Sequence, residues 1–375
     1  DEFNVIEGWE KWLLDLVAIG TVADMMPLVG ENRILVSFGL LVLRKTKRLG
    51  LQKLLQKMKM DVRYVSEEDI GFMIAPRINS ASRMDIPMKA FDLLETKDIK
   101  QADLLAKHLI KINDSRKRLV ASIVKKIRSS IEDREEDSVI VTGDPEWKIG
   151  ILGLIASKIV EISGKPAFVW GRAPSLVSDG VKKEGIIRGS CRTNGVVNIV
   201  NLMTKAQEID DKTFLDYGGH KAAGGFSVSG DDIHFLNQRL NDALEKIQKE
   251  IGGQEDKEEK QIVDMEFEID KVNNSLYLEL NRFGPCGIGN FKPTFLFNKI
   301  FLENLRTFGK NKDHLELQFT HTEHSSIKAI KFFSVPSDFG EFLKEKQQVN
   351  LIATIEKSYF LGREELRLRI IDIFL

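Results

Sequence analysis

The segment at residues 215–227, LDYGGHKAAGGFS, limits what this chain can fold into more than any other stretch. Four glycines and two alanines among its thirteen residues leave almost no side-chain bulk. Gly218 and Gly219 can adopt positive φ, and the small residues at 222–225 let another backbone or a ligand come very close. His220 stands in the middle of the segment. The residues alone allow two interpretations: a tight turn that feeds a strand, with a structural His220, or a binding segment.

The composition is typical of a soluble protein with several domains. At 375 residues the chain can form about two to four domains, and its 42% apolar and 30% charged residues are ordinary values. A net charge of −1 gives no global sign of a nucleic-acid partner, so any basic surface must be local. Two cysteines without zinc or Cys-x-x-Cys spacing favour a reducing cytoplasm. No apolar run reaches the roughly 18 residues that a membrane span needs.

Asp24 is the first candidate for a functional residue. It follows an apolar helical stretch at residues 9–18 and stands between apolar neighbours in GTVADMMPL, residues 20–28. Ionised carboxylates are uncommon in such surroundings unless they are paired or bind a metal. The sequence therefore predicts either a metal ligand or a helix cap at Asp24.

Two further segments carry groups that suit phosphate. Residues 77–83, RINSASR, place two arginines, an asparagine and two serines within seven positions, and the guanidinium fork matches phosphate oxygens. A strand expected at residues 185–192 ends with Gly189, Ser190 and Arg192, which offer a backbone amide, a hydroxyl and a guanidinium. Because side chains alternate along a strand, Ser190 and Arg192 should face the same side and reach one phosphate. The alternatives are a solvated helix end and a strand end with a surface arginine.

Hydrophobic periodicity indicates helices followed by an α/β region. Residues 31–60 are expected to be helical with a break at Gly50, and Ser66 to start the next helix with a capping box. Residues 98–136 show unbroken helical periodicity and a basic run, which is either a solvated face or the lining of a groove for a nucleic-acid backbone. Strands are then expected at 139–141, 167–170 and 185–192, with helices at 150–160, 198–203 and 231–251.

The last part of the chain has the pattern of a small β-barrel. Residues 252–261 are charged and contain glycine, which predicts a flexible linker. Alternating runs follow at 262–269, 294–302, 314–319, 327–332, 349–355 and 366–373. Five or six strands in about 110 residues are typical of an OB-fold. Some aromatic residues stand among lysines as base-stacking platforms would, although most are expected in the core: Phe291, Phe308, Phe332, Phe333 and Tyr359.

Together these motifs resemble the RecJ-type single-stranded-DNA-specific exonucleases of the DHH/DHHA1 phosphoesterase superfamily. GGH with the small residues and GF that follow it, at 218–226, is similar to the DHHA1 signature. LDLVAIGTVAD with the PL and GENR that follow, at 14–33, resembles the last metal-binding motif of the DHH domain. RINSASR resembles a motif beside the catalytic cleft, and GSCR at 189–192 resembles the 5′-phosphate pocket. GPCGIGN at 284–290 resembles the segment that opens the OB domain.

The resemblance implies an α/β multidomain protein. Its parts would be the C-terminal part of a DHH catalytic domain at 1–95, a connecting helix at 96–136, a DHHA1 substrate-binding domain at 137–251, a linker at 252–261 and an OB-fold β-barrel at 262–375. The implied activity is metal-dependent 5′→3′ hydrolysis of single-stranded DNA to mononucleotides, in DNA repair and recombination in the cytoplasm. Implied partners are single-stranded DNA with a 5′ phosphate and a single-strand-binding protein or helicase. No association with a membrane is implied.

The same resemblance implies roles for individual residues. Asp24 would be a catalytic ligand of Mn²⁺ or Mg²⁺, and Arg77, Asn79 and Arg83 would contact the scissile region. Substrate-binding residues would be Gly189, Ser190, Arg192, Gly218, Gly219 and His220. Two metal ions would activate water and stabilise the leaving oxygen, while the arginines neutralise phosphate charge.

The chain also departs from the family pattern. It contains no Asp-His-His triplet, and one carboxylate cannot hold two metal ions. It begins with Asp1, in what resembles the middle of a domain, so we expect either a fragment without the first DHH motifs or an inactive relative. Lys148 stands where the family's Trp-His-x-Gly has histidine.

Two other functions therefore stay open. One is a DHH/DHHA1 phosphodiesterase for short oligonucleotides or cyclic dinucleotides, although such proteins generally end after DHHA1. The other is a non-catalytic single-strand-binding relative.

Overall fold

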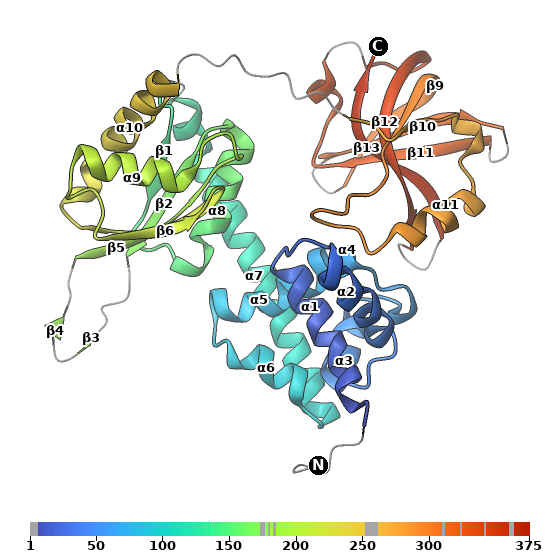
Figure 1. Ribbon diagram of the computed structural model, residues 1–375, viewed down its shortest axis with the longest axis horizontal. Coiled ribbons are helices and arrows are strands. Elements are labelled where there is room, and N and C mark those ends of the chain that lie inside the picture. Colours follow the sequence, from blue (N-terminus) through green and yellow to red (C-terminus); the bar gives the residue numbers. More distant parts are fainter. Residues whose placement is uncertain are drawn as a thin grey trace. The chain divides into compact units, whose positions relative to one another are not determined.

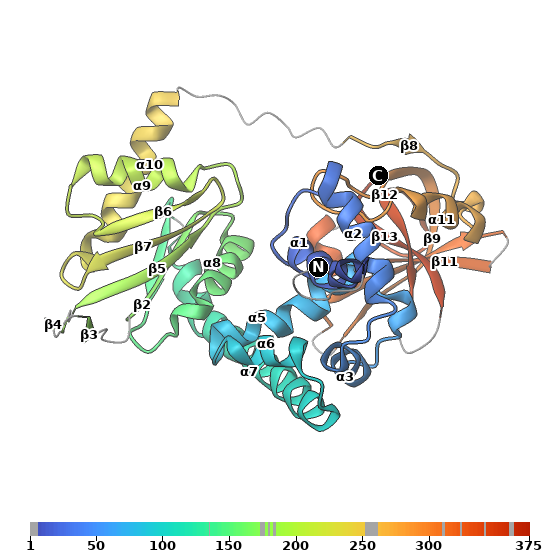
Figure 2. The same cartoon turned by 60° about the horizontal axis from the view of Figure 1, so that its bottom comes forward.

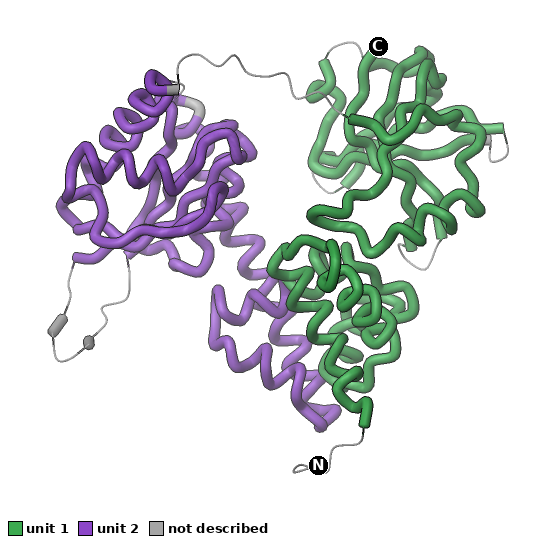
Figure 3. Tube along the Cα trace, viewed as in Figure 1, with its two compact units in different colours: residues 1–75, 259–375 green, residues 76–258 purple. Residues whose placement is uncertain are grey.

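The computed structural model describes residues 7–134, 136–172, 177–178, 181–182, 185–251, 262–309, 312–322, 325–340, 343–359 and 364–375. It comprises two compact units, residues 1–75 with 259–375 and residues 76–258 (Figure 3). The linker predicted at residues 252–261 lies outside the described residues. Among the described residues, no helix combines the length and hydrophobicity that crossing a bilayer requires.

The first unit begins with a group of short helices. These are α1 (Leu14–Ala23), α2 (Gly30–Leu43), α3 (Leu49–Lys57) and α4 (Glu67–Asp69). The two longest cross closely, because a Cβ at Gly39 of α2 would lie 2.3 Å from a backbone oxygen of α1. The helical break expected at Gly50 is wrong, since Gly50 lies buried inside α3 and the interruption falls at residues 44–48. There the buried carboxylate of Asp15 binds Arg48 at 3.0 Å, so an ion pair holds this connection.

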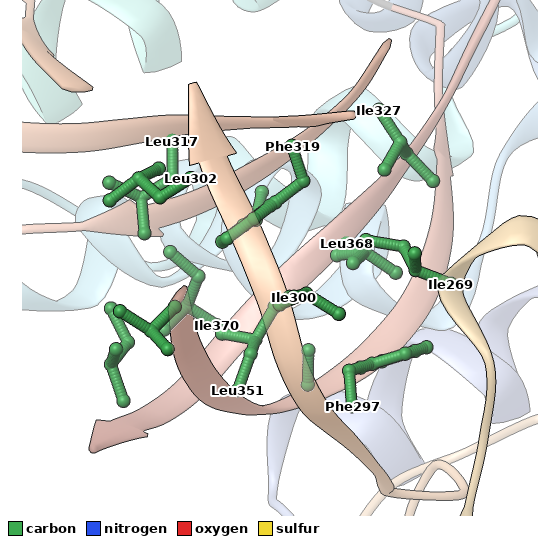
Figure 4. Close-up of a cluster of buried hydrophobic side chains, with 14 of the residues drawn as sticks. Ile269, Phe297, Ile300, Leu302, Leu317, Phe319, Ile327, Leu351, Leu368 and Ile370 are labelled. Carbon is green, nitrogen blue, oxygen red and sulfur yellow. The ribbon is translucent and has the colours of Figure 1, made fainter. Parts of the chain in front are cut away.

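The same unit contains a closed five-stranded barrel. Its strands are β9 (Phe295–Phe308), β10 (His314–His321), β11 (Ser325–Phe332), β12 (Gln347–Ser358) and β13 (Glu365–Phe374). They pair in the order β10-β11-β13-β12-β9, and pairing of β10 with β9 closes the barrel. Alternate residues point inward and form a core around Phe297, Phe319 and Leu351 (Figure 4). The multistranded barrel expected from the alternating runs is confirmed.

Two short elements flank the barrel and differ from the sequence expectation. The run at 262–269 forms only the two-residue strand β8 (Met265–Glu266), which pairs with β9. Helix α11 (Asn274–Leu280), which the sequence patterns missed, packs Leu276, Tyr277 and Leu280 against the barrel core. Helical and strand periodicity are hard to separate in such short amphipathic runs.

The barrel docks on the N-terminal helices within the first unit. The GPCGIGN segment makes this contact: the backbone N–H of Cys286 donates to the Glu67 carboxylate at 2.8 Å. A Cβ at Gly287 would lie 2.8 Å from a methyl carbon of Leu28, so the loop passes close to the helices because it lacks that carbon. The glycines that resemble the opening of an OB domain thus serve a docking loop.

The second unit is an α/β sandwich with a helical extension. The extension consists of α5 (Ala75–Met84), α6 (Met88–Glu95) and α7 (Ile99–Glu132). The predicted capping box at Ser66 is confirmed and begins α4, and a π-helical turn at Ile70–Ile74 then leads into α5. Asp98 caps α7 by accepting from the backbone N–H of Lys100 at 2.7 Å. A 34-residue helix therefore runs into the sheet region.

The sheet of the second unit has helices on both faces (Figures 1 and 2). Its strands are β1 (Ile140–Gly143), β2 (Ala167–Arg172), β5 (Ile186–Arg192), β7 (Ala223–Ser229) and β6 (Asp216–His220), in that spatial order. The strands β3 (Val177–Ser178) and β4 (Val181–Lys182) pair separately. Helix α8 (Ile149–Ser163) packs with α7 on one face, while α9 (Ile199–Ile209) and α10 (Leu236–Ile251) cover the other.

Candidate nucleic-acid-binding site

Strands β6 and β7 form a tight hairpin at the edge of the sheet. Only Lys221 and Ala222 separate them, and His220 pairs directly with Ala223. The sequence allowed a turn that feeds one strand. The structure contains that turn and strand, and the first glycines form a second strand before the turn. Since β7 also pairs with β5, the glycine segment lies beside Ser190 and Arg192.

One face of this hairpin is closely packed, and glycine is required there. A Cβ at Gly189 would lie 2.0 Å from the ring of Phe226, and one at Gly224 would lie 2.9 Å from the sulfur of Cys191. Burial raises the pKa of the Cys191 thiol to about 12, so this sulfur is an unreactive core group. Gly189 lies mid-strand between β2 and β7, which gives it a packing role. This differs from the expectation that its backbone amide faces a phosphate.

The opposite face of the hairpin is open and lined by small residues. Ser190 pairs with Gly225, which pairs with Gly218; Arg192 pairs with Ala223, which pairs with His220. Directly paired residues of an antiparallel sheet point to the same face, so all six share this side. Gly218 and Gly225 are exposed, and a Cβ at Gly218 would meet no atom within 4 Å. We call Gly218, Ala223 and Gly225 the glycine floor.

Polar groups border the glycine floor on two sides. Ser190 and Arg192 stand along β5, and His220 stands two strands away at the end of β6. With strands about 4.8 Å apart, the backbones of Arg192 and His220 are separated by about 10 Å. Gly219 stands between the exposed residues Gly218 and His220. Its φ of 152° is a backbone conformation that residues with a side chain rarely adopt. The floor thus offers space for a flat group between a guanidinium and an imidazole.

A second arginine, Arg83 of α5, contacts helix α8 near Arg192. A Cβ at Gly153 would lie 2.7 Å from Nη2 of Arg192, so the guanidinium rests against α8. A Cβ at Gly150 would lie 2.3 Å from the backbone oxygen of Arg83, whose Nη1 donates to the Gly150 carbonyl at 3.2 Å. Burial lowers the pKa of Arg83, and the positive charge of Arg192 lowers it further. The two arginines are therefore electrostatic neighbours.

The other two residues predicted on α5 lie in the same unit. Asn79 and Arg83 are four positions apart and share one helix face, and Arg77 lies two positions before Asn79. The hydroxyl of the buried Ser80 donates to the Arg77 carbonyl at 2.6 Å and also lies 3.4 Å from the Leu109 carbonyl, so α5 packs closely against α7 at this point. Burial lowers the pKa of Arg77, and the carboxylate of Asp114 on α7 partly offsets this.

Arg116 on α7 belongs to the same group, and the sequence motifs did not single it out. Burial lowers its pKa, and the charges of Arg83 and Arg77 lower it further. Arg77, Arg83, Arg116 and Arg192 thus form one group, which we call the arginine cluster. Like charges repel, and arginine does not lose its proton, so an anion near Arg83, Arg116 and Arg192 would reduce the electrostatic cost of this group. A phosphate, which accepts several charge-assisted hydrogen bonds, is a suitable anion.

The barrel carries a separate aromatic surface on which Phe308, Phe332 and Phe333 surround His314. The ring centroids of His314 and Phe333 are 4.9 Å apart at 87°, and the guanidinium of Arg369 lies 4.4 Å from the Phe332 ring. We call these four rings the aromatic cluster.

The expectation that most of the quoted aromatic residues lie in the core is wrong. Phe291 and Phe333 are 77% and 78% exposed, and none of the five residues belongs to the barrel core. Tyr359 instead stacks on Tyr64 of the N-terminal helices at 4.5 Å.

Phe333 has an unusual backbone for an exposed phenylalanine. Its φ is 55°, in the left-handed region that bulky residues avoid, and its backbone N–H donates to Nδ1 of His314 at 3.0 Å. Strain of this kind persists only where surrounding structure holds it, and it occurs often at ligand-binding positions.

Some residues of these surfaces gave no motif in the sequence. Arg116 lies within a basic run in which nothing distinguishes it from its neighbours. Arg188 lies on the same face of β5 as Ser190 and Arg192, and strand alternation from residue 192 would have found it. His314 joins the aromatic cluster only through cross-strand pairing with Phe308 and Phe332, which a single strand does not reveal.

The metal-binding expectation rests on Asp24 alone. Asp24 is the exposed residue that ends α1, and its backbone N–H donates to the Gly20 carbonyl at 3.0 Å. In the part of the chain that the structure describes, no three His, Cys, Asp or Glu side chains come together to hold a metal ion. The residues present therefore do not fit a two-metal centre.

Comparison with known proteins agrees with the fold and the order of its parts. Residues 136–253 match the DHHA1 domain family, and residues 263–372 match the RecJ OB domain. The single-stranded-DNA-specific exonuclease RecJ of Bacillus subtilis is 29% identical over 96% of this chain and 44% of its own length. The RecJ exonuclease of Haemophilus influenzae is 28% identical over 95% of this chain and 60% of its own length. The chain spans about half the length of these relatives.

A solved structure shows the same fold. The crystal structure of Thermus thermophilus RecJ in complex with Mn²⁺ superposes with a TM-score of 0.75 and 23% identity, over 100% of this chain and 51% of that one. A second structure of that protein contains Mg²⁺. The chain therefore contains a DHHA1 domain followed by a RecJ-type OB barrel. The relatives that this chain resembles in sequence, and the solved structure that it resembles in fold, are RecJ proteins.

Proposed function

We propose that this chain forms the substrate-binding part of a metal-dependent 5′→3′ exonuclease that hydrolyses single-stranded DNA to mononucleotides in DNA repair and recombination. The observation that carries the proposal is the arginine cluster beside the open glycine floor. The cluster suits phosphate charge, and the floor has room for a terminal nucleotide. The names of the relatives support the same substrate class.

In this proposal each part of the chain has a binding task. Ser190, Arg192 and His220 hold the terminal 5′ phosphate and nucleotide over the glycine floor. Arg77, Asn79 and Arg83 hold the backbone next to the bond that is cleaved. The aromatic cluster of the barrel stacks bases of single-stranded DNA, because an exposed ring accepts any base on its face. The domain boundaries given above, at 95, 136, 251 and 261, remain predictions.

The cofactor and partners are also part of the proposal. Mn²⁺ or Mg²⁺ would supply the hydrolytic chemistry, as the metals in the RecJ structures suggest. Because the described residues do not fit a two-metal centre, we derive no catalytic step through these ions and assign Asp24 only as one ligand. A single-strand-binding protein or a helicase would present the single strand in the cytoplasm.

The proposal is tested by binding. A fluorescent 5′-phosphorylated oligothymidylate, titrated by anisotropy without divalent metal, should bind this chain more tightly than a duplex of equal length. Binding should weaken as salt rises, because phosphate contacts release counterions. Equal affinity for the duplex, or no binding at low salt, would contradict the proposal. With Mn²⁺ added, we expect no release of mononucleotides by this chain, since Asp24 lacks co-ligands among the described residues.

Phe333→Ala should weaken single-strand binding by about fivefold or more, since one stacked base contributes about 1–3 kcal/mol. Phe291→Ala is the matched control, because Phe291 is equally exposed but lies outside the aromatic cluster. The same anisotropy titration measures both variants. Equal losses for the two would show that any exposed ring on the barrel acts alike, and that the aromatic cluster is no binding platform.

A further inference from the structure

Several half-buried arginines of this protein have a carboxylate partner. Arg239 binds Asp210 at 2.5 Å and Asp232 at 3.2 Å, and Arg367 binds the buried Glu356 at 2.6 Å. Within the described ranges, Arg83, Arg116 and Arg192 form no such ion pair, although burial lowers the pKa of Arg83 and Arg116. Among the described residues, no carboxylate therefore forms an ion pair with these three arginines, and an external anion could balance their charge.

Helix geometry directs Arg116 toward α5. Leu109, Asn113 and Arg116 follow one another at spacings of four and three, so they share the face of α7 that packs against α5 through Ser80. Asn113 is 0% exposed, and its Oδ1 accepts from Nη2 of Arg116 at 2.9 Å. This bond fixes the direction of the guanidinium.

Two buried donors at this position lack an acceptor. Nδ2 of Asn113 and Nε of Arg116 have no hydrogen-bond partner within the part of the chain that the structure describes. Buried donors are nearly always satisfied, so such a pair is uncommon in a folded protein. An oxyanion between α5 and α7 would satisfy both donors and reduce the repulsion among the arginines.

We infer that Asn113 and Arg116 of α7 form a further phosphate-binding element, in which Asn113 positions Arg116 and the two side chains bind a backbone phosphate of the nucleic acid. The inference deepens the proposed function, on which it rests for the identity of the ligand. It assigns the connecting helix a specific contact with the substrate, beyond a general positive charge along its length.

The chain supplies a matched control on the same helix. Arg118 is exposed, lies on the opposite side of α7, and donates to its neighbour Ser115 at 3.2 Å. Arg116→Gln and Arg118→Gln each remove one positive charge. In the anisotropy titration, Arg116→Gln should weaken binding of the 5′-phosphorylated oligothymidylate about tenfold, as expected for a charge-assisted hydrogen bond, and Arg118→Gln by about twofold or less. Arg116→Lys should recover only part of the loss, because it keeps the charge and lacks the guanidinium fork.

Asn113→Leu tests the positioning role. It should weaken binding about as much as Arg116→Gln, and the double variant should bind no more weakly than either single variant. Additive losses would show that Asn113 acts independently of Arg116.

A second measurement separates this inference from the proposed function and from folding defects. Inorganic phosphate at constant ionic strength should raise the Tm of the wild-type chain and of Arg118→Gln, and raise that of Arg116→Gln less. Equal effects of the two Gln substitutions on DNA binding and on phosphate protection would overturn the inference, while leaving the proposed function in place. If the wild type fails to bind single strands, the proposed function fails, and phosphate protection still decides whether Arg116 binds the anion.

Discussion

Replacing Arg192 by alanine should weaken binding of 5′-phosphorylated single-stranded DNA by about tenfold or more, and binding of the 5′-hydroxyl form much less. The reason is charge. A terminal phosphate carries close to two negative charges, so it gains more from a guanidinium than an internal diester does. Arg192 can produce this difference in affinity because it borders the glycine floor next to Ser190. Anisotropy titrations with the two oligonucleotides measure the ratio directly.

Two companion variants sharpen this prediction. Arg188→Ala removes an arginine from the same face of the same strand, and it should affect both oligonucleotides alike. Gly153→Ala keeps Arg192 in the sequence but would place a methyl group 2.7 Å from its Nη2, so the guanidinium has to move. Because that contact is with the end of a flexible side chain, the variant should fold normally and still lose part of the preference for a 5′ phosphate. Equal losses on the two oligonucleotides for Arg192→Ala would make Arg192 a general backbone contact.

Motifs and periodicity were sufficient where function depends on neighbours along the chain. Strand alternation predicts that Ser190 and Arg192 face one side, and the register of β5 agrees. The alternating runs predict the barrel, and serine followed by acidic residues predicts the capping box at Ser66. In each case the signal lies in the order of neighbouring residues within individual segments.

Information was missing where function depends on contacts between distant segments. Arg116 is one of many basic residues along α7, and only its packing against α5 distinguishes it from Arg118. The aromatic cluster assembles from three strands, so exposure could not be inferred from hydrophobicity, and phenylalanine was wrongly expected in the core. Gly50 was expected to interrupt a helix, but the interruption occurs earlier, at residues 44–48, where the buried carboxylate of Asp15 binds Arg48.

Gly189 shows how one residue type serves opposite purposes within a single sheet. The sequence placed it in the phosphate pocket with Ser190, yet the register turns it to the packed face, toward Phe226. Gly225 pairs with Ser190 on the open face, where a Cβ would have its nearest neighbour at 3.7 Å. One glycine therefore makes space for the core, and the other makes space for a ligand.

Gly189→Ala should accordingly destabilise the second unit by about 1–3 kcal/mol, as overpacked core substitutions do. The new methyl group would lie 2.0 Å from the Phe226 ring, and neither the ring nor the central strand can move without disturbing the core around them. Urea unfolding measures the loss. Gly225→Ala is the control: it should unfold like the wild type, because its methyl group makes an ordinary contact, and yet bind 5′-phosphorylated DNA more weakly because it fills the glycine floor.

Phe226→Leu should restore part of the stability of Gly189→Ala, since a smaller side chain leaves room for the methyl group. If Gly189→Ala instead proves as stable as Gly225→Ala and loses DNA binding, Gly189 belongs to the phosphate site after all.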